Sequence, residues 1–161
     1  MNSIMDWMQT TALNELAVGY AWTWPILETL HFFGMCVLFG ALIIMDLRLL
    51  GFEKAASVVA TDKLYPLALA GFAINLLTGI MFLFGDPYRY AVNISFQIKM
   101  VLLFLAGLNF LYYKLKVEHM LVNIGPGEDT PSIAKLIGGT SLLLWTGVLA
   151  YGRLIPYLGT G

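Results

Sequence analysis

The stretch "TWPILETLHFFGMCVLFGALIIMD", from Thr23 to Asp46, decides how the rest of the chain is interpreted. It is long and apolar enough to cross a bilayer, which takes about 20 residues. It nevertheless holds Glu28 and His31, whose three-residue spacing puts them on one face of a helix. Ionisable groups inside a membrane are costly and mark functional sites by default. The stretch therefore predicts a membrane helix that carries part of a site.

The composition of the whole chain is that of a membrane protein. Of its 161 residues, 59% are hydrophobic and 12% are charged, whereas a soluble domain carries about 25% charged residues. Stretches long enough to span a bilayer lie at 24–47, 64–84, 94–117 and 133–157. We therefore predict an all-α integral membrane protein, a bundle of four transmembrane helices in contact with membrane lipids. The net charge of −1 argues against a nucleic-acid partner.

The first 20 residues differ from the spans that follow. Apolar side chains recur there near helical spacing, with polar residues between them: Ile4, Met5, Met8, Leu13 and Leu16. This pattern predicts an amphipathic helix that lies on the membrane surface. We expect residues 1–20 to form this interfacial segment and residues 21–161 to form the transmembrane domain. The run "GDPYRY", Gly85 to Tyr90, predicts a tight turn between the second and third spans.

The distribution of Lys and Arg predicts the orientation. The N-terminal segment has neither residue, and the turn after the second span has only Arg89. The other two connections and the span ends beside them hold most of the basic residues: Arg48, Lys54, Lys63, Lys114, Lys116 and Lys135. We therefore predict a multi-pass protein of the bacterial inner (plasma) membrane with both termini in the periplasm.

Four ionisable side chains then fall at one membrane level. Glu28 and His31 lie in the outer half of the first span, Lys99 in that of the third and Arg153 in that of the fourth. Groups of this kind are expected to face the bundle interior. Three helices would therefore contribute to one site in the periplasmic half.

The second span contributes a stripe of small and mildly polar residues: Gly71, Asn75, Thr78, Gly79 and Phe82. Such a stripe predicts either close helix packing or room for a flat cofactor. Asn75 is the member that we include among the candidate cofactor-binding residues.

His31 has three possible roles. As the axial ligand of b-type haem, it would donate its Nδ1–H to Glu28, and Lys99 and Arg153 would pair with the haem propionates. As a copper ligand it would act with sulfur groups, which suit Cu(I). Met35 lies on the same face of the helix as His31. Cys36 lies about 140° round the helix from His31 and is expected to point elsewhere. In a cofactor-free structural subunit His31 would be a polar core residue.

Two further side chains keep alternatives open. Lys99 either balances the charge of Glu28 or contacts a cofactor or a reacting molecule. His119 is expected at the opposite membrane face, about 30 Å from His31 at 1.5 Å per residue, so it cannot ligate the same iron. It is either an interfacial residue or part of a second site.

Short motifs resemble a known family. Trp24, Glu28, "TLH" ending at His31, and Arg48 match a first helix with Trp, Lys, "ALH" and an inner Arg. "PLALAGFAINLLTGIMFLFGDP" is similar to a second helix of the type "PAMLLTLLFGLWLL", and "SFQIK", which ends at Lys99, matches a third helix that opens Trp-x-His-x-Lys. The first, second and third helices with those motifs are found in the bacterial four-helix membrane protoporphyrinogen oxidases, which this chain therefore resembles. The copper-resistance D-type membrane domains and uncharacterised membrane families are related to them.

The resemblance implies haem b, with His31 and Lys99 linked to its binding and to activity. Ser95 and Gln97 stand where that family has Trp and His, and Glu28 replaces a Lys. Because these changes affect residues that would handle a porphyrin, the scaffold fits a different task. We expect a redox role, either electron transfer or a haem-dependent oxidation that would make the protein an oxidoreductase. We also expect a redox partner or quinone, and a homo-oligomer.

Overall fold

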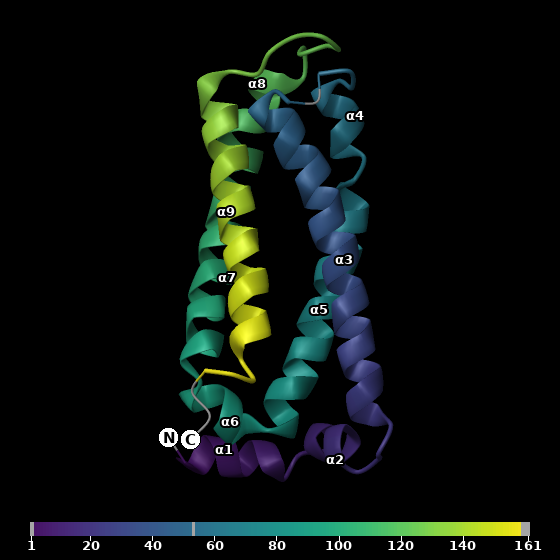
Figure 1. Ribbon diagram of the computed structural model, residues 1–161, viewed down its shortest axis with the longest axis vertical. Coiled ribbons are helices and arrows are strands. Elements are labelled where there is room, and N and C mark those ends of the chain that lie inside the picture. Colours follow the sequence, from purple (N-terminus) through teal and green to yellow (C-terminus); the bar gives the residue numbers. More distant parts are fainter. Residues whose placement is uncertain (1, 53, 159–161) are drawn as a thin grey trace.

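The computed structural model describes residues 2–52 and 54–158, and within them it contains helices and no β-strand. In chain order the elements are α1 (Asn2–Gln9), α2 (Ala12–Val18), α3 (Thr23–Leu50), α4 (Val58–Asp62), α5 (Tyr65–Gly85), α6 (Pro87–Val92), α7 (Ile94–Tyr112), η1 (Tyr113–Val117), α8 (Glu118–Leu121) and α9 (Ser132–Leu154). The all-helical fold class is thereby confirmed (Figure 1).

Four helical runs are long and apolar enough to cross a membrane: Thr23–Leu50, Val58–Gly85, Ile94–Leu121 and Ser132–Leu154. They match the four predicted spans, with shifted ends. The first extends to Leu50 because Gly51 (φ 86°) caps it in the left-handed conformation that glycine adopts without strain. The third continues to Leu121 through a π-helical turn, η1, and the helix of the fourth ends at Leu154 rather than near 157.

The outward faces of the four long helices are apolar. Large hydrophobic side chains from each of them are more than half exposed: Phe32, Phe33, Leu77, Phe104 and Leu143. Exposed apolar surface of this extent marks contact with an apolar partner, and a lipid bilayer would cover all four helices alike.

The helices pack as two pairs that meet at one end. α3 lies along α5, α7 lies along α9, and α3 also contacts α9. The α3–α5 contact depends on Gly71, where a Cβ atom would lie 2.6 Å from the Leu38 backbone nitrogen and 2.8 Å from the Gly34 carbonyl oxygen. Backbones this close require glycine, so this part of the small-residue stripe serves packing.

The contact between α3 and α9 is similarly close at Gly138, where a Cβ atom would lie 2.9 Å from the carbonyl oxygen of Asp46. This contact belongs to the end of the bundle that carries α4 and α8, which we call the α8 end (Figure 1). Toward the opposite end, the α1 end, α3 and α9 diverge (Figure 1). A cavity lies between their diverging halves.

Two short helices, rather than the single predicted one, form the N-terminal segment. They are separated at Thr11, whose hydroxyl caps α2 by accepting a hydrogen bond from the Asn14 backbone N–H. Both lie across the α1 end of the bundle (Figure 1). The Asn14 amide donates to the Phe84 carbonyl at 2.7 Å, and Tyr88 of α6 donates to Asp6. Instead of the expected tight turn at 85–90, the structure has the start of α6, because Asp86 caps a helix that begins with Pro87.

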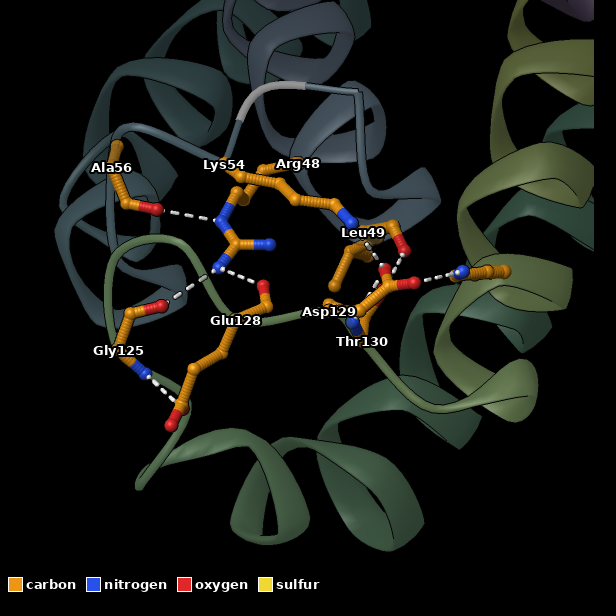
Figure 2. A network of polar contacts seen from close by, with 9 residues as sticks. Arg48, Leu49, Lys54, Ala56, Gly125, Glu128, Asp129 and Thr130 are labelled. Atoms are coloured by element: carbon orange, nitrogen blue, oxygen red, sulfur yellow. Dashed lines mark hydrogen bonds and ion pairs between the residues drawn. The ribbon is translucent and has the colours of Figure 1, made fainter.

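At the α8 end, Arg48 fastens two loops to α3 (Figure 2). Its side chain is fully buried. Its Nε donates to the Ala56 carbonyl at 2.6 Å, and one terminal nitrogen donates to the carbonyls of Gly125 and Glu128, each at 3.2 Å. Because all three acceptors are backbone groups, Arg48 orders the loops by hydrogen bonding rather than by ion pairing.

Candidate functional site

This cavity between α3 and α9, of about 650 Å³, is lined by residues of α3, α5, α6, α7 and α9. We call it the His31 cavity. Glu28, His31, Lys99 and Arg153 all line it. The structure therefore brings together four of the five candidate residues from three different helices. Asn75, the fifth, lines an adjoining cavity of about 150 Å³ that shares His31 and Lys99.

The imidazole of His31 has a hydrogen-bond partner, a hydroxyl group of α5. Its Nδ1 lies 2.7 Å from the Thr78 hydroxyl oxygen. That hydroxyl has one proton, which it donates to backbone carbonyls of its own helix, at 2.7 Å in the case of Ile74. While that proton is donated to a backbone carbonyl, the Thr78 oxygen accepts from His31, and on this basis we assign the ring proton to Nδ1. Nε2 has no hydrogen-bond partner among the described residues and keeps its lone pair free.

This arrangement corrects the expected role of Glu28. The carboxylate accepts a hydrogen bond at 3.1 Å from the indole nitrogen of Trp24, one turn earlier in α3. Thr78 holds the position next to His31 Nδ1 in its place. Glu28 is also exposed, because its place near the start of α3 puts it at the α1 end.

The His31 cavity has an excess of positive charge. Lys99, Arg153 and Arg89 line it, and Glu28 is the one acidic residue in its wall. Among the described residues, none of the three cations lies within 4.0 Å of a carboxylate. Lys99 therefore does not pair directly with Glu28. The Nε of Arg89 is buried without a hydrogen-bond partner, and a buried donor of this kind calls for an acceptor.

Glycines shape the walls of this cavity. A Cβ atom on Gly152 would lie 3.4 Å from the ammonium nitrogen of Lys99, and one on Gly79 would lie 4.0 Å from the ring of His31. A Cβ atom on Gly40 would meet nothing within 4 Å. The small residues therefore have two roles in this chain: Gly34 and Gly71 bring α3 and α5 into contact, whereas the other three leave space.

The sulfur groups lie in the same cavity. Met35 and Cys36 both line it, so the expectation that Cys36 points elsewhere was wrong. The cavity is wide enough to reach round α3, which a helical-angle argument cannot show. Within residues 2–52 and 54–158, however, no three His, Cys, Asp or Glu side chains gather closely enough to hold a metal ion.

The other histidine is remote from this site. His119 lies in α8, at the end of the bundle opposite α1 (Figure 1), and its side chain is exposed. It is therefore not part of the His31 cavity.

Two residues of the site were not predicted. Thr78 is a member of the small-residue stripe, and the sequence does not indicate which helix that stripe faces. Arg89 was treated only as a turn charge. No signal in the sequence assigns Arg89 to the site, because its position depends on where α6 packs.

Fold and site together define the class of protein: a bundle of four long apolar helices with a basic, histidine-containing cavity between them. The chain belongs to a family of unknown function, DUF6644, whose family model matches residues 4–158. No curated protein and no solved structure matches the chain. The resemblance to the porphyrinogen oxidases therefore stays a prediction.

Proposed function

We propose that the protein is an integral membrane protein that binds b-type haem in the His31 cavity and has a redox role. The free Nε2 of His31, with Nδ1 held by Thr78, is the observation that carries this proposal. A metal-ligating imidazole characteristically donates its other N–H to an oxygen acceptor, which fixes tautomer and ring orientation. The contact between His31 Nδ1 and the Thr78 hydroxyl has the geometry that this role requires.

The dimensions and charge of the cavity also support haem. Its volume of about 650 Å³ lies within the roughly 300–1,000 Å³ that is typical of cofactor pockets. Haem b is a flat, largely apolar ring with two carboxylates. Apolar residues such as Phe82, Phe96 and Leu149 line the cavity beside the three cations. A ligand with two negative charges would balance the excess of positive charge.

Each group of residues would have a defined task. His31 would ligate the iron, and Thr78 would orient its ring. Lys99, Arg89 and Arg153 would hold the propionates, since guanidinium groups bind carboxylates strongly. The apolar walls would keep water away from the iron, and the haem itself would supply one-electron chemistry at a potential set by its surroundings.

Copper is the competing ligand, because His31, Met35 and Cys36 line one cavity and sulfur ligands suit Cu(I). The three basic side chains in the same wall argue against it, since they repel a cation and attract an anionic cofactor. Electrostatics therefore favours haem over copper.

The experiment is an optical spectrum of the protein purified from haem-replete cells, with metal analysis of the same sample. We expect a Soret band and about one haem per chain, lost in His31→Ala and retained in His119→Ala. His119 provides the matched control because it is the chain's other histidine. Haem in His31→Ala at the wild-type level would contradict the proposal, and so would stoichiometric copper without a Soret band.

A second variant tests the cavity without touching the ligand. Gly40→Leu adds a side chain where a Cβ atom meets nothing within 4 Å, and leucine favours a helix more than glycine does. We expect this variant to fold and insert but to bind haem poorly, because the new side chain occupies the cavity. Wild-type haem content in Gly40→Leu would place the haem elsewhere.

We also propose that both termini lie in the periplasm of a bacterium, on the basis of the Lys and Arg distribution. A periplasmic reporter fused after residue 161 should be active, and one inserted between Gly125 and Thr130 should be inactive. The reverse result would move the His31 cavity to the cytoplasmic half of the membrane.

A further inference from the structure

A second cavity, of about 280 Å³, lies toward the α8 end of the bundle. We call it the Asp46 cavity. Its walls come from α3, α5, α7, α9 and the start of η1. It is almost entirely apolar, and Asp46 is the one charged residue among those that line it. The haem proposal gives it no role.

Asp46 is deeply buried without full hydrogen bonding. Its side chain is 4% exposed, and Oδ2 has no hydrogen-bond partner among the described residues. Ser141 of α9 lies beside the carboxyl group, and Asn109 of α7 lines the same cavity while its amide donates to the Ile137 carbonyl at 3.2 Å. Burying a carboxyl oxygen without a hydrogen-bond partner costs free energy. The unpartnered Oδ2 of Asp46 therefore points to a ligand that would form a hydrogen bond with it.

The walls around the carboxyl group are aromatic. The cavity is lined by five rings: Tyr65, Phe72, Phe110, Tyr113 and Trp145. The hydroxyl of Tyr113 is directed outward, since it donates to Asp62 at 3.3 Å. Aromatic faces favour a flat aromatic ligand, through offset or edge-to-face contacts worth about 0.5–1.5 kcal/mol each.

The Asp46 cavity is accessible from the side of the bundle. α5 and α7 both line it but make little contact with each other. Leu69 of α5 and Phe110 of α7 are in its wall and yet exposed on the outer surface. A Cβ atom on Gly107, which is three residues before Phe110 on α7 and also lines the cavity, would meet nothing within 4 Å. In a membrane this opening faces lipid, so a lipophilic molecule would reach Asp46 without crossing water.

The smaller cavity, which Asn75 lines, adjoins both main cavities. This small cavity shares His31 and Lys99 with the His31 cavity. It shares Leu38, Phe72, Leu103 and Trp145 with the Asp46 cavity. Leu38 is seven residues from His31 on α3, about 10 Å at 1.5 Å per residue. Molecules bound in the two cavities would therefore lie close together.

We propose that the Asp46 cavity binds the ring of a membrane quinone. A carboxyl group accepts a hydrogen bond from a quinol hydroxyl when ionised and donates one to a quinone carbonyl when protonated, so one residue serves both redox forms. The aromatic walls suit the flat ring, and the lateral opening suits a ligand dissolved in the bilayer. The choice of a quinone over other flat lipophilic ligands rests on the redox function proposed for the His31 cavity.

The test is direct binding of menadione, a short naphthoquinone, to the haem-free protein in nanodiscs. Trp145 lies in the cavity wall, so its fluorescence reports occupancy once the other three tryptophans have been replaced by phenylalanine. 2-Methylnaphthalene, which has the same rings without the carbonyls, is the matched probe. Circular dichroism and gel filtration of each variant establish that it is folded.

We expect saturable quenching by menadione and at least about tenfold weaker binding of 2-methylnaphthalene, since a site that hydrogen-bonds its ligand rejects the analogue that lacks those groups. Asp46→Leu should weaken menadione binding about tenfold or more, and Asp46→Asn, which keeps hydrogen-bonding capacity, by less than about threefold. Gly107→Leu should block the opening and abolish quenching. Gly40→Leu, in the other cavity, should bind menadione as the wild type does.

Equal binding of the two probes, or wild-type binding by both Asp46→Leu and Gly107→Leu, would overturn the proposal. Because the assay uses haem-free protein, it is independent of the haem spectrum. A Soret band without menadione binding would remove the quinone site and leave the haem proposal intact, whereas menadione binding without a Soret band would do the reverse.

Discussion

Replacing Thr78 by valine should weaken haem binding while leaving the fold in place. The side chain keeps its size and loses the oxygen that lies 2.7 Å from His31 Nδ1. The imidazole then has two choices. It keeps the proton on Nδ1 without an acceptor, or it moves the proton to Nε2 and loses the lone pair that would bind iron.

The expected loss of haem affinity follows from either choice. A buried N–H without a partner costs about 1–3 kcal/mol, and loss of an outer partner of a ligating histidine typically lowers metal affinity about 10- to 100-fold. We therefore expect the dissociation constant for haem to rise by about 10- to 100-fold in Thr78→Val. Without haem the stability should change little, because the unligated imidazole is free to adopt the other tautomer.

The assay is a haem titration of the haem-free protein in detergent, followed at the Soret band. Thr29→Val is the matched control: its hydroxyl also donates to a carbonyl four residues earlier, that of Pro25 at 2.8 Å, but it does not contact His31. We expect wild-type affinity in this control. If Thr78→Val binds haem as tightly as Thr29→Val does while His31→Ala does not bind it, then Thr78 does not orient the ligand and the tautomer argument is refuted.

Three further predictions concern packing, the loops and pH. Gly71→Ala should lower the free energy of unfolding by about 1–3 kcal/mol because its Cβ atom meets the backbone of Leu38, whereas Gly107→Ala should stabilise slightly; thermal unfolding in detergent that ranks the two equally would contradict this. Arg48→Met should leave three loop carbonyls without their donor. It should lower the free energy of unfolding by about 1–3 kcal/mol and speed proteolysis between residues 122 and 131. An unchanged cleavage rate would show that Arg48 does not order this loop. The pKa of Asp129 lies below its ordinary value of 3.8, chiefly because the ammonium group of Lys135 in α9 donates a hydrogen bond to the carboxylate. The wild type should therefore be more stable than Asp129→Asn above about pH 4, and this difference should disappear as pH falls through the lowered pKa. A difference that grows in acid would refute the pairing.

Local composition was enough to predict the helices. Runs of apolar residues about 20 long have few alternatives to a helix where a bilayer must be crossed, and all four predicted spans are helical in the structure. Positions within a helix were predictable for the same reason. Glu28 and His31 share a face because three residues turn a helix by about 300°, and both line one cavity.

The structure alone decided how the helices face one another. Periodicity fixes the angle between residues on one helix but says nothing of the rotation of its neighbour, so Glu28 was expected beside His31 Nδ1 where Thr78 of α5 lies. The same limit applies to Cys36, which lines the cavity because α9 diverges from α3. Arg89 joined the site only through the placement of α6.

Asp46 shows the difference most clearly. The sequence placed it one residue from the expected end of the first span, where a carboxylate is ordinarily hydrated at the membrane surface. The helix instead continues to Leu50, and the close approach of α9 at Gly138 covers this side of α3. A hydrated or a buried carboxyl group can follow from the same local sequence, because burial depends on which other segment packs against it, and that is a property of the tertiary structure alone.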